Sequence, residues 1–212
     1  MEEDTLPKNA IVIDVDFINK YLPELKRHIN TYMKREVQDL DLAYFCAQLG
    51  SMMNVDEDKD ERFFVILVST DGDAKLTNCI PGSVAEVNNR GCHMGNWDLE
   101  FTNFTSAGMV NVSDRILEMI DVLAQKPEVE RVFLIPEESQ IAPPHVHSFI
   151  ELLKKHMGAD AFLRKSFFLG GLQKADRFSH LKGLPYMNLT FAFCVAFGLT
   201  DEEIESIHIK SN

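Results

Sequence analysis

Two carboxylates follow the first apolar run of the chain. The β-branched residues Ile11 to Ile13 stand in an unbroken row, and Asp14 and Asp16 come directly after it. Such a row predicts a buried strand of a parallel sheet, and ligands of open α/β sheets bind just beyond the carboxyl ends of the strands. Because a charge at the edge of a buried sheet is costly without a partner, we expect one of three partners. These are a divalent cation, a phosphate-handling reaction, or a neighbouring Lys or Arg.

Two more acidic groups stand where they could join this pair. Asp114 lies at the start of a predicted helix, and Glu137 and Glu138 follow the strand predicted at 131–136. The first and fourth predicted strands are commonly neighbours in α/β sheets, so Glu137 and Glu138 could converge on Asp14 and Asp16. Carboxylates within a few Å repel one another, and Mg²⁺ or Mn²⁺ is the usual remedy. The alternative is that Asp114 only complements a helix dipole and that the two glutamates are solvated loop residues.

The periodicity of apolar residues predicts the elements that position these groups. Strands are predicted at 11–16, 63–68, 97–104, 131–136 and 161–163, and helices at 17–34, 37–49, 114–125 and 145–157. Strands that alternate with helices predict an α/β fold, a three-layer sandwich around a mostly parallel, right-handed sheet of about five strands. Asp71-Gly72 between two strand-like runs signals a hairpin, and 88–96 is predicted to be a loop.

The tail of the chain has a different character. We expect an α/β domain over residues 1–165 and a helical extension over 166–212 that packs on the same domain. Its most apolar stretch, Met187 to Leu199, predicts a helix that covers one face of the sheet or, alternatively, forms a homo-oligomer contact. Thr200 to Glu203 resembles the cap and first turn of a last short helix.

Composition limits the partners. There are 33 acidic against 21 basic residues, a formal net charge of −12, so most of the surface should repel nucleic acid and anionic membranes. An RNA partner would need a local basic patch or bound metal ions. We see no signal peptide, membrane span, Cys-x-x-Cys pair or glycine-rich phosphate loop. A cytoplasmic protein without a nucleotide cofactor is therefore expected.

The order of these segments is similar to that of the PIN-like domains, and of their NYN branch in particular. Residues 11–19, with sequence IVIDVDFIN, resemble that family's opening strand, which ends in Asp, a further acidic residue and Asn. Val112 to Asp114 resembles its Asp-bearing helix start, and 134–143 occupies the place of its apolar strand and acidic loop. The resemblance covers residues 10–165, through short motifs.

The resemblance implies a ribonuclease in which acidic residues hold Mg²⁺ or Mn²⁺ to activate water against a phosphodiester. It implies these site residues: Asp14, Asp16, Asn19, Asp114 and Glu138. Of these, Asp14, Asp114 and Glu138 would be the metal ligands. Glu138 and Gln140 stand where the family has two Asp residues, which alters the charge and reach of the ligands. A member that has lost catalysis is therefore one of the alternatives.

Two other functions compete. Haloacid-dehalogenase-like phosphatases also begin with an apolar strand and Asp-x-Asp, in which the first Asp, here Asp14, would be the nucleophile. Their second strand ends in Ser or Thr, as Phe64 to Ser69 does, but the sequence offers no clear candidate for their Lys between Ser69 and Glu137. The other alternative is a non-catalytic assembly or interaction protein that uses the helix predicted at 187–199.

Overall fold

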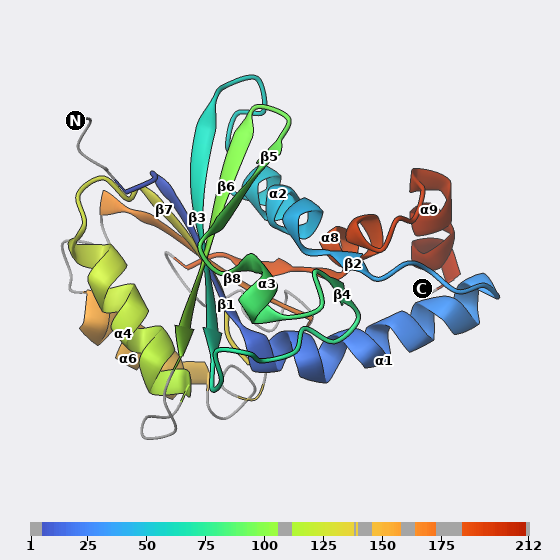
Figure 1. Ribbon diagram of the computed structural model, residues 1–212, viewed down its shortest axis with the longest axis horizontal. Coiled ribbons are helices and arrows are strands. Elements are labelled where there is room, and N and C mark those ends of the chain that lie inside the picture. Colours follow the sequence, from blue (N-terminus) through green and yellow to red (C-terminus); the bar gives the residue numbers. More distant parts are fainter. Residues whose placement is uncertain are drawn as a thin grey trace.

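The computed structural model of the chain describes residues 6–105, 112–137, 139, 146–157, 164–172 and 184–210 (Figure 1). Its strands are β1 (Asn9–Asp14), β2 (Leu40–Asp41), β3 (Glu61–Ser69), β4 (Cys79–Ile80), β5 (Arg90–Met94), β6 (Trp97–Thr105), β7 (Arg131–Ile135), β8 (Ser166–Gly171) and β9 (Tyr186–Asn188). Its helices are α1 (Val15–Met33), α2 (Leu42–Met52), α3 (Val84–Val87), α4 (Val112–Gln125), α6 (Val146–Met157), α8 (Thr190–Ala196) and α9 (Asp201–Lys210).

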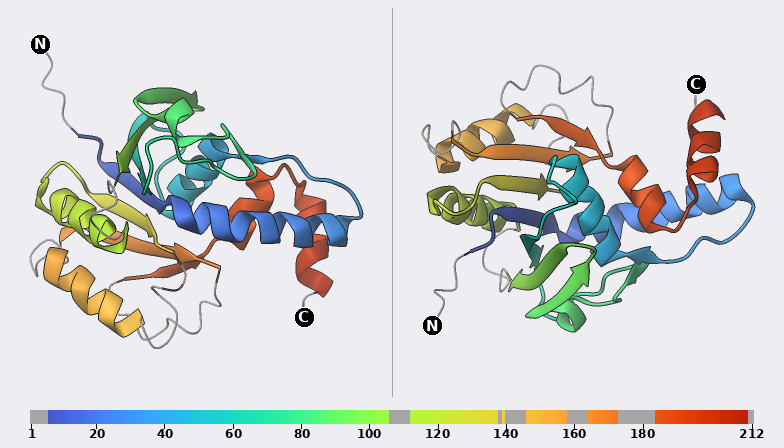
Figure 2. Two further views of the ribbon diagram at one scale, coloured as in Figure 1. Left: turned by 60° about the horizontal axis from the view of Figure 1, so that its bottom comes forward. Right: turned by 90° about the horizontal axis from the view of Figure 1, so that it is seen from above.

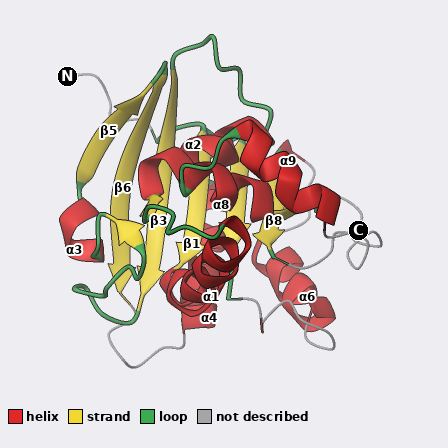
Figure 3. Ribbon diagram, turned by 90° about the vertical axis from the view of Figure 1, so that its right-hand side faces the viewer, coloured by secondary structure: helices red, strands yellow, loops and turns green. Residues whose placement is uncertain are grey.

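A mostly parallel sheet forms the centre of the fold. Seven strands lie in the order β5-β6-β3-β1-β7-β8-β9, and only β5 runs antiparallel to its neighbour. Figure 3 shows β5, β6, β3 and β1 side by side, with β5 at one edge. The α/β class and the mostly parallel sheet are confirmed, but the expected count of about five strands is wrong. The strand predicted at 161–163 lies outside the described residues, and β8 begins at Ser166.

Helices cover both faces of the sheet, and each face has its own apolar core. Side chains from α1, α2 and α8 pack on one face, around Ile11 and Ile13 of β1. Helices α4 and α6 pack on the other face, around Val12 of β1 and Leu134 of β7. Figures 1 and 2 show these two groups of helices on opposite sides of the strands. Because successive side chains of a strand point to opposite faces, the unbroken apolar row of β1 serves both cores.

Two predictions between β3 and β6 are wrong. The Asp71-Gly72 turn does not form a hairpin, because β3 pairs in parallel with β1 and β6, while β4 pairs with β2 in a separate two-stranded sheet. The expected loop at 88–96 contains β5, which forms an antiparallel hairpin with β6 through Gly95, at φ 64°, and Asn96. A Gly-Asn pair suits such a two-residue turn because glycine adopts positive φ without steric cost.

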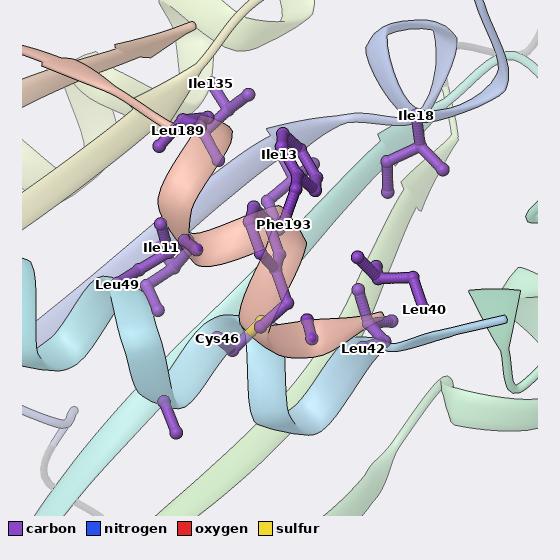
Figure 4. Close-up of a cluster of buried hydrophobic side chains, with 14 of the residues drawn as sticks. Ile11, Ile13, Ile18, Leu40, Leu42, Cys46, Leu49, Ile135, Leu189 and Phe193 are labelled. Atoms are coloured by element: carbon purple, nitrogen blue, oxygen red, sulfur yellow. The ribbon is translucent and has the colours of Figure 1, made fainter. Parts of the chain in front are cut away.

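The extension expected to be helical over 166–212 is only partly helical. This segment first supplies β8 and β9 to the central sheet, and the stretch predicted as one helix from Met187 divides into the end of β9 and the short helix α8. Figure 4 shows Phe193 of α8 among Ile11, Ile13 and Cys46. Thr200 caps α9 as expected: its hydroxyl accepts from the Glu203 N–H at 3.3 Å, and the Glu203 carboxylate accepts from the Thr200 N–H at 3.0 Å.

Candidate functional site

The strand order places a reversal point between β1 and β7. From β1 the chain moves outward through β3 to β6, then returns to the other side of β1 and continues through β7, β8 and β9. Helix α1 follows β1 on the way to β3, and α4 leads back from β6 to β7. The two helices pack on opposite faces of the sheet. Ligands of doubly wound sheets bind in the crevice at this reversal, beyond the carboxyl ends of the strands. Asp14 ends β1 here and Glu137 follows β7, so the two acidic positions expected to converge lie at the ends of adjacent strands.

Asp14 is buried, and backbone N–H groups surround its carboxylate. Only 1 % of the residue is exposed. Its Oδ1 accepts from the N–H of Asp16 at 2.9 Å, which makes Asp14 the N-cap of α1, and the N–H of Glu137 also donates to it. Burial raises the pKa of Asp14 to about 7, the two N–H donors oppose that shift, and the charges of Asp16 and Glu137 add to it. Asp14 therefore titrates near neutrality.

Glu137 sits in a network of donors. Its Oε1 accepts from Lys20 Nζ at 2.6 Å and from the Tyr21 hydroxyl at 2.8 Å. Its Oε2 accepts from the Ser139 N–H at 3.0 Å and from the Ser139 hydroxyl. Partial burial would raise the pKa of Glu137, but the hydrogen bonds from Lys20, Ser139 and Tyr21 lower it below its usual value. Glu137 is therefore held as a carboxylate beside the ammonium of Lys20.

The other predicted site residues do not join Asp14 in one cluster. Asp16 is exposed, and Asp114 is exposed in the first turn of α4. Both ends of the Asn19 amide are engaged elsewhere: Nδ2 donates to the Lys75 carbonyl at 2.8 Å and Oδ1 accepts from the Thr77 N–H at 2.8 Å. Asn19 thus holds the loop between β3 and β4. Glu138, with Gln140, lies outside the described residues.

The neighbouring strand ends carry a second polar network. Ser69, at the end of β3, is buried, and its hydroxyl lies 2.8 Å from the Asp71 carbonyl and 2.9 Å from Asn103 Oδ1 on β6. The Asn103 amide also donates to the Thr105 hydroxyl at 3.0 Å. These bonds tie together the turns after β3 and β6. Ser69 follows Val68, which pairs with Asp14, so a hydroxyl lies one strand away from the carboxylate.

The fit of these residues to Mg²⁺ or Mn²⁺ is poor. Mg²⁺ keeps several of its waters and is usually bound through one or two carboxylates that are free to coordinate it. In the part of the chain that the structure describes, no group of three or more His, Cys, Asp or Glu side chains is arranged to hold a metal ion. Glu137 already has a cation in Lys20, and Asp14 is directed at backbone N–H groups. We therefore derive no catalytic step through a metal.

Two site residues were missed in the sequence. Lys20 and Tyr21 lie on α1, about two turns after Asp14. Both side chains donate to Glu137, which lies in the connection that follows β7. The sequence did contain a signal for Lys20: a Lys or Arg was one of the expected partners of the carboxylates, and Lys20 lies on the helix that follows Asp14. Distance along the chain hid the pair, since 117 residues separate Lys20 from Glu137.

No helix of the described residues combines the length and the apolar character that a membrane crossing requires.

Comparison with curated proteins and with solved structures gave no match. The chain does match a family model over residues 3–168, which is more than half of its length, and the model's description is a family of unknown function, DUF6621. This chain is therefore a member of the DUF6621 family.

Proposed function

We propose that this protein is a non-catalytic binding domain of PIN-like descent, in which an internal ion pair has replaced the metal of a nuclease site. The Lys20–Glu137 pair carries the proposal, because its 2.6 Å contact brings a positive charge to the strand end where the resemblance would require a cation. The order of the parallel strands and the position of Asp14 at the reversal point support the descent. The ion pair of Glu137 with Lys20 and the backbone N–H donors to Asp14 support the loss of metal-dependent cleavage.

The chemistry of the two carboxylates agrees with a binding role. A metal ligand must be deprotonated, and a nearby cation lowers the pKa of a carboxyl group. Burial raises the pKa of Asp14 to about 7, so a cation that bound this carboxyl group at neutral pH would have to displace a proton from part of the molecules. Asp14 caps α1, and the Lys20–Glu137 ion pair lies next to it. We infer that a ligand at the carboxyl ends of β1 and β7 would be bound and not hydrolysed.

Thermal unfolding with and without millimolar Mn²⁺ tests the proposal. A ligand that binds only the folded state raises stability by RT ln(1 + [L]/Kd). We expect no shift in the melting temperature of the wild type. Lys20→Met removes the ammonium and leaves the carboxylates of Asp14 and Glu137 near each other without a cation. Because one or two carboxylates together with water can hold a small divalent cation, this variant should gain a Mn²⁺-dependent rise in melting temperature. Lys20→Arg keeps the charge and should behave as the wild type does.

A direct cleavage assay completes the test. Single-stranded RNA incubated with the wild type and Mn²⁺ should remain intact. Cleavage that disappears in Asp14→Asn would contradict the proposal, as would a Mn²⁺-dependent rise in the wild-type melting temperature that disappears in the same variant. Either result would instead support an active metal-dependent ribonuclease.

A phosphatase of the haloacid-dehalogenase type is the second candidate, favoured by one observation. Ser69 ends β3 directly beside the end of β1, where that family has its Ser or Thr. Lys20, next to Glu137, offers the cation that the sequence did not suggest. The 1 % exposure of Asp14 opposes this candidate, since a nucleophile must reach its substrate. Hydrolysis of p-nitrophenyl phosphate that is lost in both Asp14→Asn and Ser69→Ala would favour the phosphatase over the binding domain.

A further inference from the structure

A separate hollow lies at the opposite end of the sheet from Asp14. It has a volume of about 340 Å³ and opens between α2 and the turn that joins β5 to β6. Trp97, which lines the hollow, is the first residue of β6. Strand β6 runs parallel to β3, which in turn runs parallel to β1. The hollow is therefore at the amino ends of the strands, away from the reversal point. Its volume is in the range of small-molecule sites.

The walls of this hollow are held in place by the fold. Gly50 allows α2 to approach Trp97 closely, because a Cβ at Gly50 would lie 2.6 Å from Cζ3 of that ring. The indole N–H of Trp97 donates to the Asp56 carbonyl at 3.2 Å, and the Asn96 amide donates to the Glu57 carbonyl at 3.0 Å. These bonds anchor the loop after α2 against the β5–β6 turn, so the hollow is formed before any ligand arrives.

The lining combines an apolar floor with one carboxylate. Ala47 and Met94 contribute apolar surface, and Tyr44 lines the hollow while 40 % of the residue remains exposed. Glu57 lines the hollow and is exposed, and its Oε1 accepts from the Ser51 hydroxyl at 2.6 Å. The ammonium of Lys59 pairs with Asp56 at 2.9 Å, and no basic side chain among the described residues forms an ion pair with Glu57.

We propose that this hollow binds a small organic cation, an amidinium, guanidinium or primary ammonium on a compact apolar body. The cationic group would lie against the Glu57 carboxylate, since charge-assisted hydrogen bonds are the stronger ones, and near the face of Tyr44, which attracts cations. The apolar body would contact Ala47 and Met94. The net charge of −12 raises the local concentration of cations at the surface. This site is independent of the function proposed above.

Benzamidine and benzamide provide a matched pair of probes, because they share size and shape and differ in charge. The chain contains a single tryptophan, and that residue lines the hollow, so its fluorescence reports binding directly. We expect benzamidine to bind the wild type about tenfold more tightly than benzamide. In Glu57→Gln, which keeps an acceptor for Ser51, benzamidine should bind as weakly as benzamide does.

Two further variants separate the site from general charge effects. Tyr44→Leu removes the aromatic face and should weaken benzamidine binding severalfold, while Asp60→Asn, an exposed acid on the same loop, should leave binding unchanged. Equal affinity of the wild type for the two probes would overturn the proposal. So would a preference for benzamidine that survives in Glu57→Gln, or the absence of any response of Trp97 to benzamidine. Unchanged melting temperatures of the variants establish that each one is folded.

Discussion

At the scale of single residues, the carboxylates of Asp14 and Glu137 have their partners inside the chain. Asp14 caps α1 and accepts from the backbone of the β7 connection, and Glu137 pairs with Lys20. The sequence predicted that Asp14 would need a partner, because its position after a buried strand follows from local pattern. It did not predict which partner, because Lys20 meets Glu137 only once β1 and β7 lie side by side.

Asp14 should make the stability of the fold depend on pH. Its pKa is raised from 3.8 to about 7, so between these values the folded state binds a proton that the unfolded state has lost. Stability therefore falls as pH rises across this window, by at most about 1.4 kcal/mol per pH unit, and levels off above it. Asp14→Asn cannot ionise, and urea unfolding from about pH 5 to about pH 8 should show that its stability lacks this downward slope.

The exposed residue Asp60 supplies the control. Asp60→Asn should retain the wild-type slope, because an exposed side chain meets nearly the same surroundings in the folded and unfolded states. If Asp14→Asn and the wild type show the same dependence on pH, Asp14 is ionised in the folded protein across the whole window. Its burial would then not control its protonation.

At the scale of elements, the position of α8 shows whether the apolar stretch near the C-terminus packs within the chain or remains exposed for a partner. Phe193 is fully buried and stacks on Phe45 of α2, with ring centroids 4.5 Å apart and an interplanar angle of 11°. Phe191, on the same helix, is 50 % exposed. Most of the apolar surface of α8 is therefore used within the chain, as one of the two sequence-based interpretations expected.

Substitution of the two phenylalanines should separate these roles. Phe193→Ala leaves a cavity in the core around Ile11 and should lower the free energy of unfolding by about 3–5 kcal/mol. Phe191→Ala removes an exposed ring and should change it by no more than about 0.5 kcal/mol. Urea denaturation measures both. A large loss in Phe191→Ala, accompanied by a smaller particle in light scattering, would show instead that α8 joins two copies of the chain.

At the scale of the whole molecule, the sheet extends beyond the stretch that matches the family model. That match ends at residue 168, whereas β8 continues to Gly171 and β9 follows at Tyr186–Asn188. Leu189 and Phe193 also fill the core against β1 and β7. The C-terminal segment is therefore an integral part of the domain.

A chain that ends at Lys165 should fail to fold. It would leave the edge of β7 unpaired and expose the apolar side chains that β8 and α8 cover. A chain that ends at Leu199 loses only α9, which is attached through the Arg35–Glu203 ion pair, the Tyr32 hydroxyl on the Ser206 carbonyl and the buried Ile204. This longer chain should keep its fold with reduced stability. Circular dichroism and NMR dispersion distinguish the two, and cooperative unfolding of residues 1–165 would contradict the prediction.

The sequence by itself determined the elements around Asp14. Apolar rows predicted β1, β3, β6 and β7, and helical periodicity predicted α1, α4 and α6, because local backbone preference and burial repeat with the period of each element. These predictions placed Asp14 at a strand end, Asp114 at a helix start and Glu137 after β7. Proximity of Glu137 to Asp14 was also within reach, since it requires only that β1 and β7 be neighbours.

Only the tertiary structure decided how the strands pair and which side chains satisfy the acidic groups. The pairing of β4 with β2, the addition of β8 and β9 to the sheet, and the contact of Lys20 with Glu137 all join residues that are distant in sequence. Such contacts depend on the packing of both cores at once, and no local pattern encodes them. The fold thus supplies backbone N–H donors to Asp14 and the ammonium of Lys20 to Glu137.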